Sequence, residues 1–595
     1  MCGLAGLYVV GETDEVSMRP SLRAMCDAMI HRGPDAEGLW SSHDSRCALG
    51  HRRLAIIDLD PRSNQPMHSA DQRYTVVFNG EIYNFQALRR ELEAAGIVLR
   101  TSSDTEVLLE GYALWGPGVF GRLDGMFALA IHDTLTRRLV LARDRLGEKP
   151  LYHTTAGGLF AFASELKPLL LVPGVSVQVG ERGLFDYFTL RYVPEPATIF
   201  DDIHALQPGT YRIVHDDGRS SEHAFHAYDI EPARLRGDDY VDALEAALTE
   251  SVRTRLVADV PVGALLSSGV DSSLVCALAA GLTNRGIHCF GAGFAGDPED
   301  ETPQARAIAE HLGLPFEALT VSADDLASGA SGFGARLDEP NGDRSCVPTY
   351  LLSRLIRSHV TVAVSGDGGD ELFAGYGRYA VLARDAALQE GPANGRVEHY
   401  LAKGLPVFDR NVLDDAFPGE AARFRARFAS RFASLFARDE LDAYDRLRMI
   451  DLHSYLPGAV LAKVDRMAMK HSLEVRTPFF SPQVLALSSR LPRELVQDRG
   501  LLKIALRRLL ARHLPPELIQ AKKQGFGMPA AFFGRNEALF RRLAERSDEV
   551  LRAWAPLRDR PGAWAALQHG ARANINSLWG WTVLGQWVES LPARG

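Results

Sequence analysis

The second residue of the chain is a cysteine, directly behind the initiator methionine in the opening sequence MCGLAGLYVV. Removal of methionine before a small residue would leave Cys2 with both a thiol and a free α-amino group. An α-amine titrates at a pKa of about 7.7 to 8.0, so it can take the thiol proton near neutral pH and act as the residue's own base. The position predicts an N-terminal nucleophile. The alternative is a buried cysteine in a first strand that serves only packing.

Two loops in the second half of the chain contain a different group of reactive residues. They are LLSSGVDSS (265–273) and SGDGGDELFAGY (365–376). A Ser/Gly loop between a strand and a helix directs backbone N–H groups and hydroxyls at one spot, which forms a cradle for an anion. No G-x-x-x-x-G-K-[ST] segment occurs, so the cradle is not a Walker A loop.

Asp271 and Asp370 lie in these loops and are the natural pair to hold Mg²⁺. Magnesium takes carboxylate oxygens together with phosphate oxygens in an octahedral shell. Each aspartate is also suited to cap the N-terminus of the helix that follows it. Capping and metal binding can coexist, so both roles stay open.

Four further segments accompany Cys2 in the first hundred or so residues: HRGPD (31–35), GHRRLAIIDL (50–59), NGEIYN (79–84) and SDTE (103–106). With Cys2 ahead of them, they resemble in order the glutaminase half of class II glutamine amidotransferases. Taken singly, NG is commonly a hairpin turn and RGPD a surface loop. The resemblance implies that Cys2 attacks the side-chain amide of glutamine.

The residue types fit the roles that this resemblance implies. Asn79 and the backbone N–H of Gly80 would form an oxyanion hole, where one lost donor typically costs about 3 kcal/mol. Arg53 would bind the α-carboxylate of glutamine with its planar fork, and Glu81 or Asp104 would accept its ammonium.

The loop at 265–273 resembles the pyrophosphate loop of enzymes that cleave ATP between the α and β phosphates, whose usual form is S-G-G-x-D-S. Ser268 replaces a glycine of that form, so either the backbone there is ordinary or strain is carried. The residues expected to line the nucleotide, largely through backbone contacts, are Leu266, Ser267, Ser268, Gly269, Asp271, Ser272, Ala292, Ser365 and Gly366.

Two later segments extend the resemblance over nearly the whole chain. They are YLPGAVLAKVDRMAMKHSLEVRTPFF (455–480) and KKQGFGMP (522–529), and with them the chain resembles glutamine-dependent asparagine synthetases. By this match Asp367 takes the place of an acidic residue important for forming a β-aspartyl-AMP intermediate, and Lys523 that of a lysine that stabilises adenylate chemistry. The resemblance implies ATP and Mg²⁺ as cofactors, with glutamine, ATP and, by default, aspartate as substrates.

The acceptor is less well defined by the sequence. Arg344, in LDEPNGDRSCVPTY, is a candidate for binding the acceptor's carboxylate, and an exposed loop arginine is the alternative. Amidation of another carboxylic acid in a specialised pathway would use the same chemistry. A non-enzymatic scaffold is a third hypothesis, but such a protein should have lost Cys2, Asp271 or Asp370, and the chain retains all three.

The elements that must position these residues change in character along the chain. Short β-type segments up to about residue 200 predict an α+β domain of stacked sheets, which the resemblance identifies as an antiparallel N-terminal nucleophile hydrolase sandwich over residues 1–207. Residues 208–238 are predicted to form a connecting hairpin and linker. Alternating strands, loops and helices in 239–595 predict an α/β parallel-sheet domain of the ATP-pyrophosphatase type with added helices, whose loops meet at the carboxyl ends of the strands.

The totals are consistent with this division and exclude other classes. A chain of 595 residues is too long for one hydrophobic core. The net charge of -9 provides no basic field for nucleic acid, and no apolar run is long enough to span a bilayer. The six sparse cysteines form no C-x-x-C pair, which argues against a disulfide framework or a zinc site. We expect a cytoplasmic enzyme that acts on small molecules, and a homodimer is compatible with the sequence.

Overall fold

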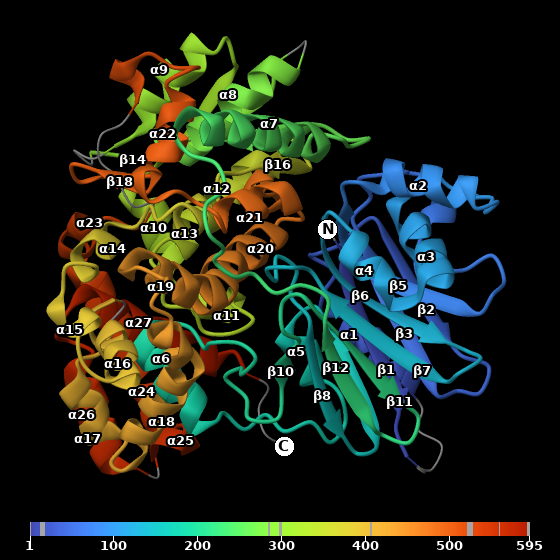
Figure 1. The fold of residues 1–595 in the computed structure, drawn as a ribbon. Coiled ribbons are helices and arrows are strands. Elements are labelled where there is room, and N and C mark those ends of the chain that lie inside the picture. Colours follow the sequence, from blue (N-terminus) through green and yellow to red (C-terminus); the bar gives the residue numbers. More distant parts are fainter. Residues whose placement is uncertain are drawn as a thin grey trace.

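The structure is a computed structural model that describes residues 2–11, 18–283, 286–296, 300–404, 407–519, 527–558 and 560–591. A lobe of β-sheets, formed by the first third of the chain, lies beside a larger lobe that contains a smaller sheet and most of the helices (Figure 1). The two lobes correspond to the two types of domain that the sequence predicts.

The first lobe contains two six-stranded sheets, in which every pairing of named strands is antiparallel. The first sheet has the order β10-β8-β9-β1-β3-β2 and the second β12-β11-β7-β6-β5-β4. The strands are β1 (Gly3–Val9), β2 (Ala36–Ser41), β3 (Cys47–Arg53), β4 (Met67–His68), β5 (Tyr74–Ile82), β6 (Gly125–Asp133), β7 (Arg138–Arg143), β8 (Tyr152–Ala156), β9 (Leu159–Ala163), β10 (His204–Ala205), β11 (Thr210–His215) and β12 (Ser220–Ala224).

The strands are apolar on both faces because both faces of each sheet are covered. In β1, Leu4 and Tyr8 belong to the core between the two sheets, whereas Leu7 and Val9 pack outward against the layer that contains α1 (Met18–Asp27) and α5 (Leu166–Leu169). This alternation follows from the two-residue period of a strand. Helices α2 (Phe85–Ala94) and α3 (Asp104–Trp115) cover the outer face of the second sheet, and α4 (Val119–Arg122) follows them. The predicted sandwich of stacked antiparallel sheets is confirmed.

The segment predicted as a connecting hairpin and linker does begin with a hairpin, and this hairpin belongs to the second sheet. Strand β11 pairs with β7 and with β12, so residues 210–224 form an edge hairpin of that sheet. The boundary predicted after residue 207 therefore falls before these strands. The connecting segment runs from the end of β12 to the start of α7 (Gly237–Arg255).

The second lobe contains a five-stranded sheet in which all pairings are parallel, as the sequence predicts. The strands are β13 (Val262–Leu265), β14 (His288–Phe294), β15 (Phe316–Val321), β16 (Val362–Val364) and β17 (Glu474–Arg476), in the order β15-β14-β13-β16-β17. The order reverses between β13 and β16, so a crevice is expected outside the carboxyl ends of these two strands. Both predicted nucleotide loops follow these strands directly.

Helices surround the parallel sheet and form the lower part of the second lobe in Figure 1. They include α8 (Val270–Leu282), α9 (Thr302–His311), α10 (Ala323–Ala330), α11 (Phe333–Arg336), α12 (Cys346–Arg357), α13 (Gly369–Leu372), α20 (Ala462–Met469), α21 (Pro482–Ser488) and α22 (Ile504–Leu510). The others are α14 (Gly377–Leu382), α15 (Ala386–Gln389), α16 (Ala393–Gly404), α17 (Arg410–Ala416), α18 (Glu420–Phe432), α19 (Ala443–Ile450), α23 (Ala530–Arg535), α24 (Glu537–Ala553), α25 (Ala555–Arg558), α26 (Pro561–Gly570) and α27 (Ile575–Glu589). A short antiparallel pair, β18 (Gln497–Asp498) and β19 (Leu501–Leu502), lies before α22.

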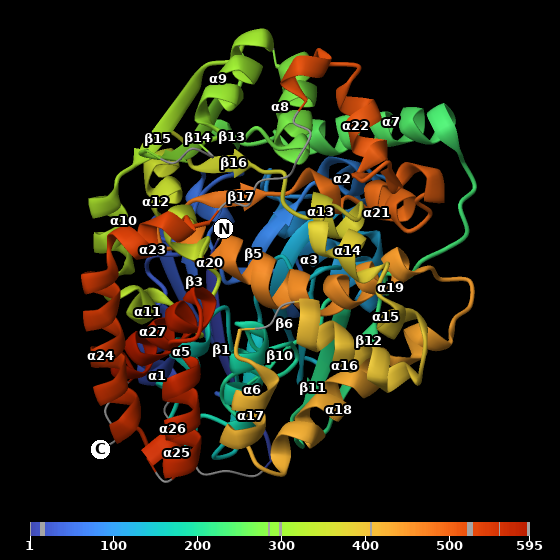
Figure 2. The same cartoon turned by 90° about the vertical axis from the view of Figure 1, so that its left-hand side faces the viewer.

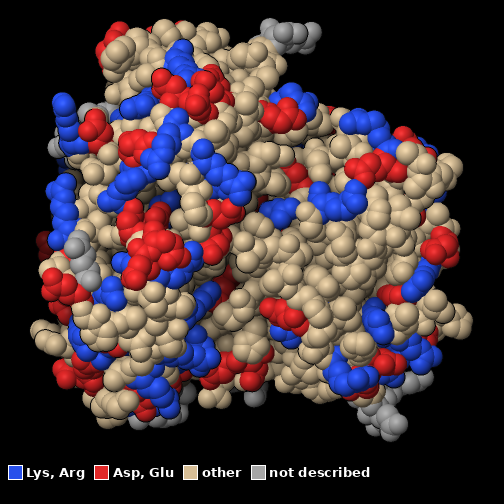
Figure 3. Space-filling view, in the orientation of Figure 1, with Lys and Arg blue, Asp and Glu red and all other residues tan. Residues whose placement is uncertain are grey.

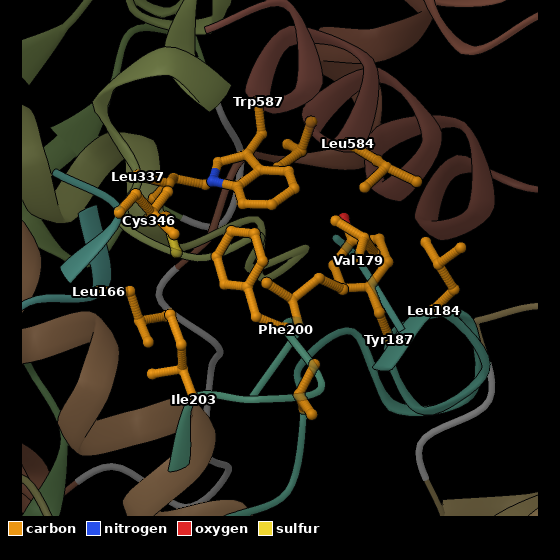
Figure 4. Packing of buried hydrophobic residues seen from close by; sticks show 14 of the residues in the cluster. Leu166, Val179, Leu184, Tyr187, Phe200, Ile203, Leu337, Cys346, Leu584 and Trp587 are labelled. Carbon is orange, nitrogen blue, oxygen red and sulfur yellow. The ribbon is translucent and has the colours of Figure 1, made fainter. Parts of the chain in front are cut away.

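One helix from the first third of the chain lies among the helices of the second lobe. Helix α6 (Glu181–Leu190) contacts α17 and α18, and Figure 2 shows it beside them. The Tyr187 hydroxyl donates to the backbone carbonyl of Gly580 at 2.8 Å, and the rings of Phe200 and Trp587 lie 5.7 Å apart. Figure 4 shows that residues between 166 and 203 share this core with residues of α27, such as Leu584 and Trp587. The two lobes are therefore joined by a common hydrophobic core.

On the face shown in Figure 3, acidic and basic side chains are interspersed over the helical lobe, and a broad uncharged area lies over the sheet lobe. Among the described helices, none combines the length and the apolar character needed to cross a membrane. All six cysteines are unpaired and buried.

Candidate active sites

The strand period brings the predicted nucleophile and two of its predicted partners to one place. Cys2 comes two residues before Leu4, which faces the core between the sheets, so it lies on the same face of β1. On β5, Val77 belongs to that core, and Asn79 and Glu81 follow it with the same parity. All three functional side chains are thus directed to one end of the gap between the two sheets.

Cys2 is held through its backbone. Its N–H donates to Asn79 Oδ1 at 2.8 Å, and its carbonyl accepts from Arg32 Nε at 3.1 Å. Its Sγ lies 3.9 Å from the carbonyl oxygen of Leu54. Burial raises the pKa of the Cys2 thiol, so the thiol needs a base close by to become a nucleophile.

Asn79 and Gly80 lie where an oxyanion hole is predicted. Asn79 uses its side-chain oxygen for Cys2, and its buried Nδ2 has no hydrogen-bond partner among the described residues. A buried donor without a partner is costly unless a ligand uses it. A Cβ on Gly80 would come within 2.1 Å of the Met126 carbonyl oxygen on β6, so this position requires glycine. The Asn79 amide therefore offers a donor beside Cys2, the predicted nucleophile.

Arg53 reaches the same pocket from β3, because Leu49 on that strand also faces the core between the sheets. Its guanidinium is held by its own loop: it donates to Asn64 Oδ1 at 2.7 Å and also to the carbonyl oxygen of Asp58. These bonds fix the position of the positive charge. They also occupy part of the fork that was predicted to bind a carboxylate.

The two carboxyls predicted to bind an ammonium, Glu81 and Asp104, lie in this pocket together. Asp104 is the first residue of α3, and its Oδ2 accepts from the Ile82 N–H at 3.0 Å. Burial raises the pKa of Asp104 to about 6. Burial and the nearby Asp104 raise the pKa of Glu81 well above its usual range. Two buried carboxyls that share a site do not both ionise readily, and a cation between them would relieve this.

Five of the residues predicted to act on glutamine line a single pocket, together with two residues that the sequence interpretation did not assign: Cys2, Arg53, Gly80, Glu81, Asp104, Gln65 and Glu474. Asn79 does not line it but bonds the Cys2 N–H beside it. Gln65 fixes β5 from outside, since its Oε1 accepts from the Phe78 N–H at 2.6 Å. Glu474 belongs to β17 of the parallel sheet, about 390 residues beyond Glu81 in the sequence. The sequence signal that could have identified it is a pair of charged residues two positions apart in SLEVRTPFF, an otherwise apolar β-type stretch.

The second candidate site lies in the crevice at the switch point of the parallel sheet. The loop after β13 contains Ser267, whose Oγ lies 2.9 Å from the Oγ of Ser272 and accepts from the Gly269 N–H at 3.1 Å. The loop after β16 contains Ser365 and Gly366. A Cβ on Gly366 would come within 2.6 Å of the Ser272 nitrogen, so the two loops touch.

The remaining residues predicted to line the nucleotide flank these loops. The Leu266 N–H donates to the carbonyl of Phe290 on β14 at 2.8 Å, and Ala292 follows on the same strand, half-buried. Ser268 is not among the described residues with a positive φ, so its backbone is ordinary and the departure from glycine carries no strain there. Its buried Oγ has no partner among the described residues.

Asp271 and Asp370 converge on one point, as the metal prediction requires. Lys503 Nζ lies 2.5 Å from Asp370 Oδ1 and is also paired with Asp271 Oδ2. Asp271 Oδ1 is buried with no partner among the described residues. Two converging carboxylates with a spare oxygen fit a hard divalent cation. Burial lowers the pKa of Lys503. The sequence interpretation did not assign this lysine to the site.

The residues predicted to handle the acceptor lie around the start of α12. Arg344 is half-buried, and burial lowers its pKa. Ser365 donates to Asp367 Oδ2 at 2.8 Å. Lys463, which the sequence interpretation did not assign, donates to the Ser345 hydroxyl at 2.9 Å, and although burial opposes its charge, Asp343 and Asp367 raise its pKa. Lys523 lies outside the described residues.

Comparison with known proteins identifies similar chains over most of this length. A family model described as a glutamine amidotransferase domain matches residues 1–226, and one described as asparagine synthase matches residues 243–589. Asparagine synthetase [glutamine-hydrolyzing] 1 of Bacillus subtilis is 31% identical over 90% of this chain and 88% of that protein. A putative asparagine synthetase [glutamine-hydrolyzing] of Mycobacterium tuberculosis is 36% identical over 84% of this chain and 83% of that protein. Amidase chry2 of Gibberella zeae is 30% identical over 63% of this chain and 59% of that protein.

Proposed function

The chain belongs to the glutamine-hydrolysing asparagine synthetase family, and from this premise we propose that its acceptor is aspartate and its product asparagine. It is an ATP-dependent amidoligase that takes its nitrogen from glutamine. The residue roles below are part of the proposal.

In the first half-reaction, the Cys2 thiolate attacks the side-chain amide carbon of glutamine after its proton has passed to the α-amine. The oxyanion that forms accepts hydrogen bonds from Asn79 Nδ2 and the Gly80 N–H. Its collapse breaks the C–N bond and releases ammonia, which takes a proton as it leaves, and a glutamyl thioester remains. Water then attacks the thioester, and glutamate and the free thiol are regenerated.

In the second half-reaction, a carboxylate oxygen of the acceptor attacks the α-phosphorus of ATP. Pyrophosphate leaves and an acyl-AMP forms, and ammonia then attacks the acyl carbon and displaces AMP. Asp271 and Asp370 would hold Mg²⁺, which when bound neutralises phosphate charge. Arg344 and Lys463 supply positive charge for an acidic acceptor, which supports aspartate.

Ammonia must stay neutral to act as a nucleophile, so the path between the sites has to be apolar. A buried apolar cluster lies between the glutamine pocket and the parallel sheet and contains residues of both domains: Leu54, Ile56, Tyr83, Met126, Val362 and Met469. Leu54 and Ile56 also line the glutamine pocket, and Val362 lies on the strand that leads to the second nucleotide loop. We place the ammonia path along this cluster.

The observation that carries the proposal is Asn79, whose Oδ1 bonds Cys2 and whose Nδ2 has no partner among the described residues, beside a pocket lined by Cys2, Arg53 and two carboxyls. The test is an acceptor screen with ATP, Mg²⁺ and ammonium, followed by pyrophosphate release and by analysis of the amide product. We expect aspartate to be the best acceptor. Stoichiometric ADP and orthophosphate would contradict the adenylation chemistry.

A second candidate acceptor is another carboxylic acid, amidated by the same steps. The relative named amidase chry2 supports this alternative, since the family contains members that are not named asparagine synthetases. In the same screen, release of pyrophosphate with an acid other than aspartate, and none with aspartate, would favour it.

A further inference from the structure

Strand β17 of the parallel sheet brings two charged side chains into contact with the glutamine pocket. Arg476 is fully buried, and its NH2 donates to Glu81 Oε2 at 2.9 Å. Its Nε donates to Glu474 Oε1 at 2.7 Å, and its NH1 donates to the carbonyls of Arg255 at 2.9 Å and Val257 at 2.6 Å. The arginine is therefore fixed by its own domain and directed at a residue of the other.

Glu81 needs such a partner because of the groups around it. The charged groups that face it from the described elements are Asp104 on α3 and Glu474 and Arg476 on β17. The two carboxylates disfavour its ionisation, and Arg476 favours it. Burial opposes the charge of Glu474, yet the neighbouring cations, Arg476 among them, lower its pKa. Arg476 thus compensates two buried carboxylates, one from each domain.

We propose that Arg476 and Glu474 of the second domain are positioning residues of the glutamine site. Arg476 favours the ionised form of Glu81 and orients it for the ammonium of glutamine, and Glu474 holds Arg476 in place. The inference rests on the proposed glutaminase function of the pocket. It also means that the amidotransferase segment by itself has an incomplete glutamine site.

The Arg476–Glu81 contact differs from an ordinary interdomain ion pair because Glu81 lines the glutamine pocket. Arg255 also crosses between the domains, with its NH2 3.1 Å from Asp124 Oδ1, but Asp124 does not line the glutamine pocket. This pair provides a matched control. Asp124→Asn removes an interdomain charge contact and should leave glutamine kinetics unchanged.

The experiment compares full-length wild type, Arg476→Met, Arg476→Lys, Glu474→Gln and Asp124→Asn in glutamine hydrolysis and in ammonia-dependent synthesis. In Arg476→Met the KM for glutamine should rise at least about thirtyfold, the lower end of what truncating one member of a buried charge pair costs. Arg476→Lys should recover part of this loss. Glu474→Gln should raise the KM in the same direction by a smaller factor. The ratio of glutamine-dependent to ammonia-dependent product should fall in proportion to the rise in the KM for glutamine.

A second readout separates positioning from a general packing defect. In a Cys2→Ala background, the Kd for glutamine is measured by calorimetry between pH 5 and 8. Loss of the cation beside Glu81 should move the onset of binding to higher pH in Arg476→Met, because its carboxyl then protonates more readily. Arg476→Lys should restore the wild-type onset.

The outcomes distinguish the two proposals. If Arg476→Met does not fold, Arg476→Lys and Glu474→Gln decide. An unchanged glutamine KM in these two variants, or an unchanged KM and pH onset in a folded Arg476→Met, overturns the inference while the glutaminase function stands. A wild type that makes product from ammonium but hydrolyses no glutamine overturns the proposed function and the inference with it.

Discussion

The two candidate sites are built by opposite means. The candidate glutamine pocket is made largely from side chains on the faces of antiparallel strands, such as Arg53 on β3 and Glu81 on β5. The nucleotide crevice is made from loops that follow parallel strands, in which Ser267 bonds Ser272. In the first site the protein leaves a donor and carboxyls without full compensation. In the second, Lys503 pairs with both aspartates, although Asp271 Oδ1 keeps no partner among the described residues.

This difference indicates how each site binds its substrate. Strand side chains are rigid, so the glutamine pocket is preorganised and its ligand supplies the missing charges. The loop residues have partners that a nucleotide must displace, so binding there includes a rearrangement of local contacts. Substitutions in the first site should therefore remove one nitrogen source, whereas substitutions in the second should remove synthesis from both.

The largest effect, and the sharpest test of this separation, is expected for Cys2→Ala. Glutamine-dependent product should fall to background, since loss of a nucleophile costs about 10⁶ in rate in comparable covalent catalysis. Ammonia-dependent synthesis should survive, because the second site needs only neutral ammonia. An extra residue between Met1 and Cys2 should reproduce the loss, because the α-amine would become an amide. The measurement is product from glutamine against product from ammonium in both variants, and retained glutamine-dependent synthesis in Cys2→Ala would refute the nucleophile assignment.

Asp271→Asn and Asp370→Asn should impair synthesis from both nitrogen sources and spare glutamine hydrolysis. Each removes one anionic ligand of the expected metal and should lower synthesis from either nitrogen source by about a hundredfold or more, at the upper end of what disturbing a metal site costs. Glutamine hydrolysis should remain measurable. Rates of pyrophosphate and glutamate formation in the same samples provide the comparison. If a folded variant lost both, the two sites could not be as separate as their construction indicates.

Arg344→Ala should produce a smaller effect confined to one substrate of the second site. The KM for the acceptor should rise between about tenfold and a hundredfold, as expected for loss of a charge-assisted carboxylate contact. The KM for ATP should change far less. Initial rates with each substrate varied in turn measure the two constants, and equal changes in both would assign Arg344 to general loop structure.

The smallest effect is the pH dependence of the first site. The pKa of Asp104 is raised to about 6 by burial, so its carboxylate is lost as the pH falls through that value. In the Cys2→Ala protein the Kd for glutamine should therefore rise about tenfold per unit below pH 6. Asp104→Asn has no such carboxyl, so its Kd should be weaker and should lose the part of the pH dependence that centres near pH 6, while any part due to Glu81 remains. A Kd in the Cys2→Ala protein that does not change between pH 5 and 7 would show that Asp104 takes no part.

The sequence allowed most of the first site to be predicted, because its residues lie in local motifs with a strand period. Asn79 and Glu81 are two apart in NGEIYN, and that spacing alone places them on one face. Glu474 and Arg476 were not predicted, since nothing local connects SLEVRTPFF with a pocket that begins at Cys2. Their contribution depends on how the domains pack.

The same limit applies to the second site and to the fold. The aspartate pair was predicted from loop chemistry, but Lys503 was not, because it comes from a segment about 130 residues beyond Asp370. Strand β11 was interpreted as part of a connecting hairpin because its turn residues resemble a linker, whereas its pairing with β7 depends on an open sheet edge. Long-range pairing decided each of these features.

Helix α6 has a consequence for how genes of this kind can be recombined. Its side chains Tyr187 and Phe188 contact α27, which the chain forms nearly four hundred residues later, at Gly580 and Trp581. A chimera cut near residue 207 would combine the α6 of one parent with the receiving helices of another. Such hybrids should fold only when α6 and α27 come from the same parent. The two halves of this protein therefore carry separate chemistry, but they cannot be exchanged independently between homologues.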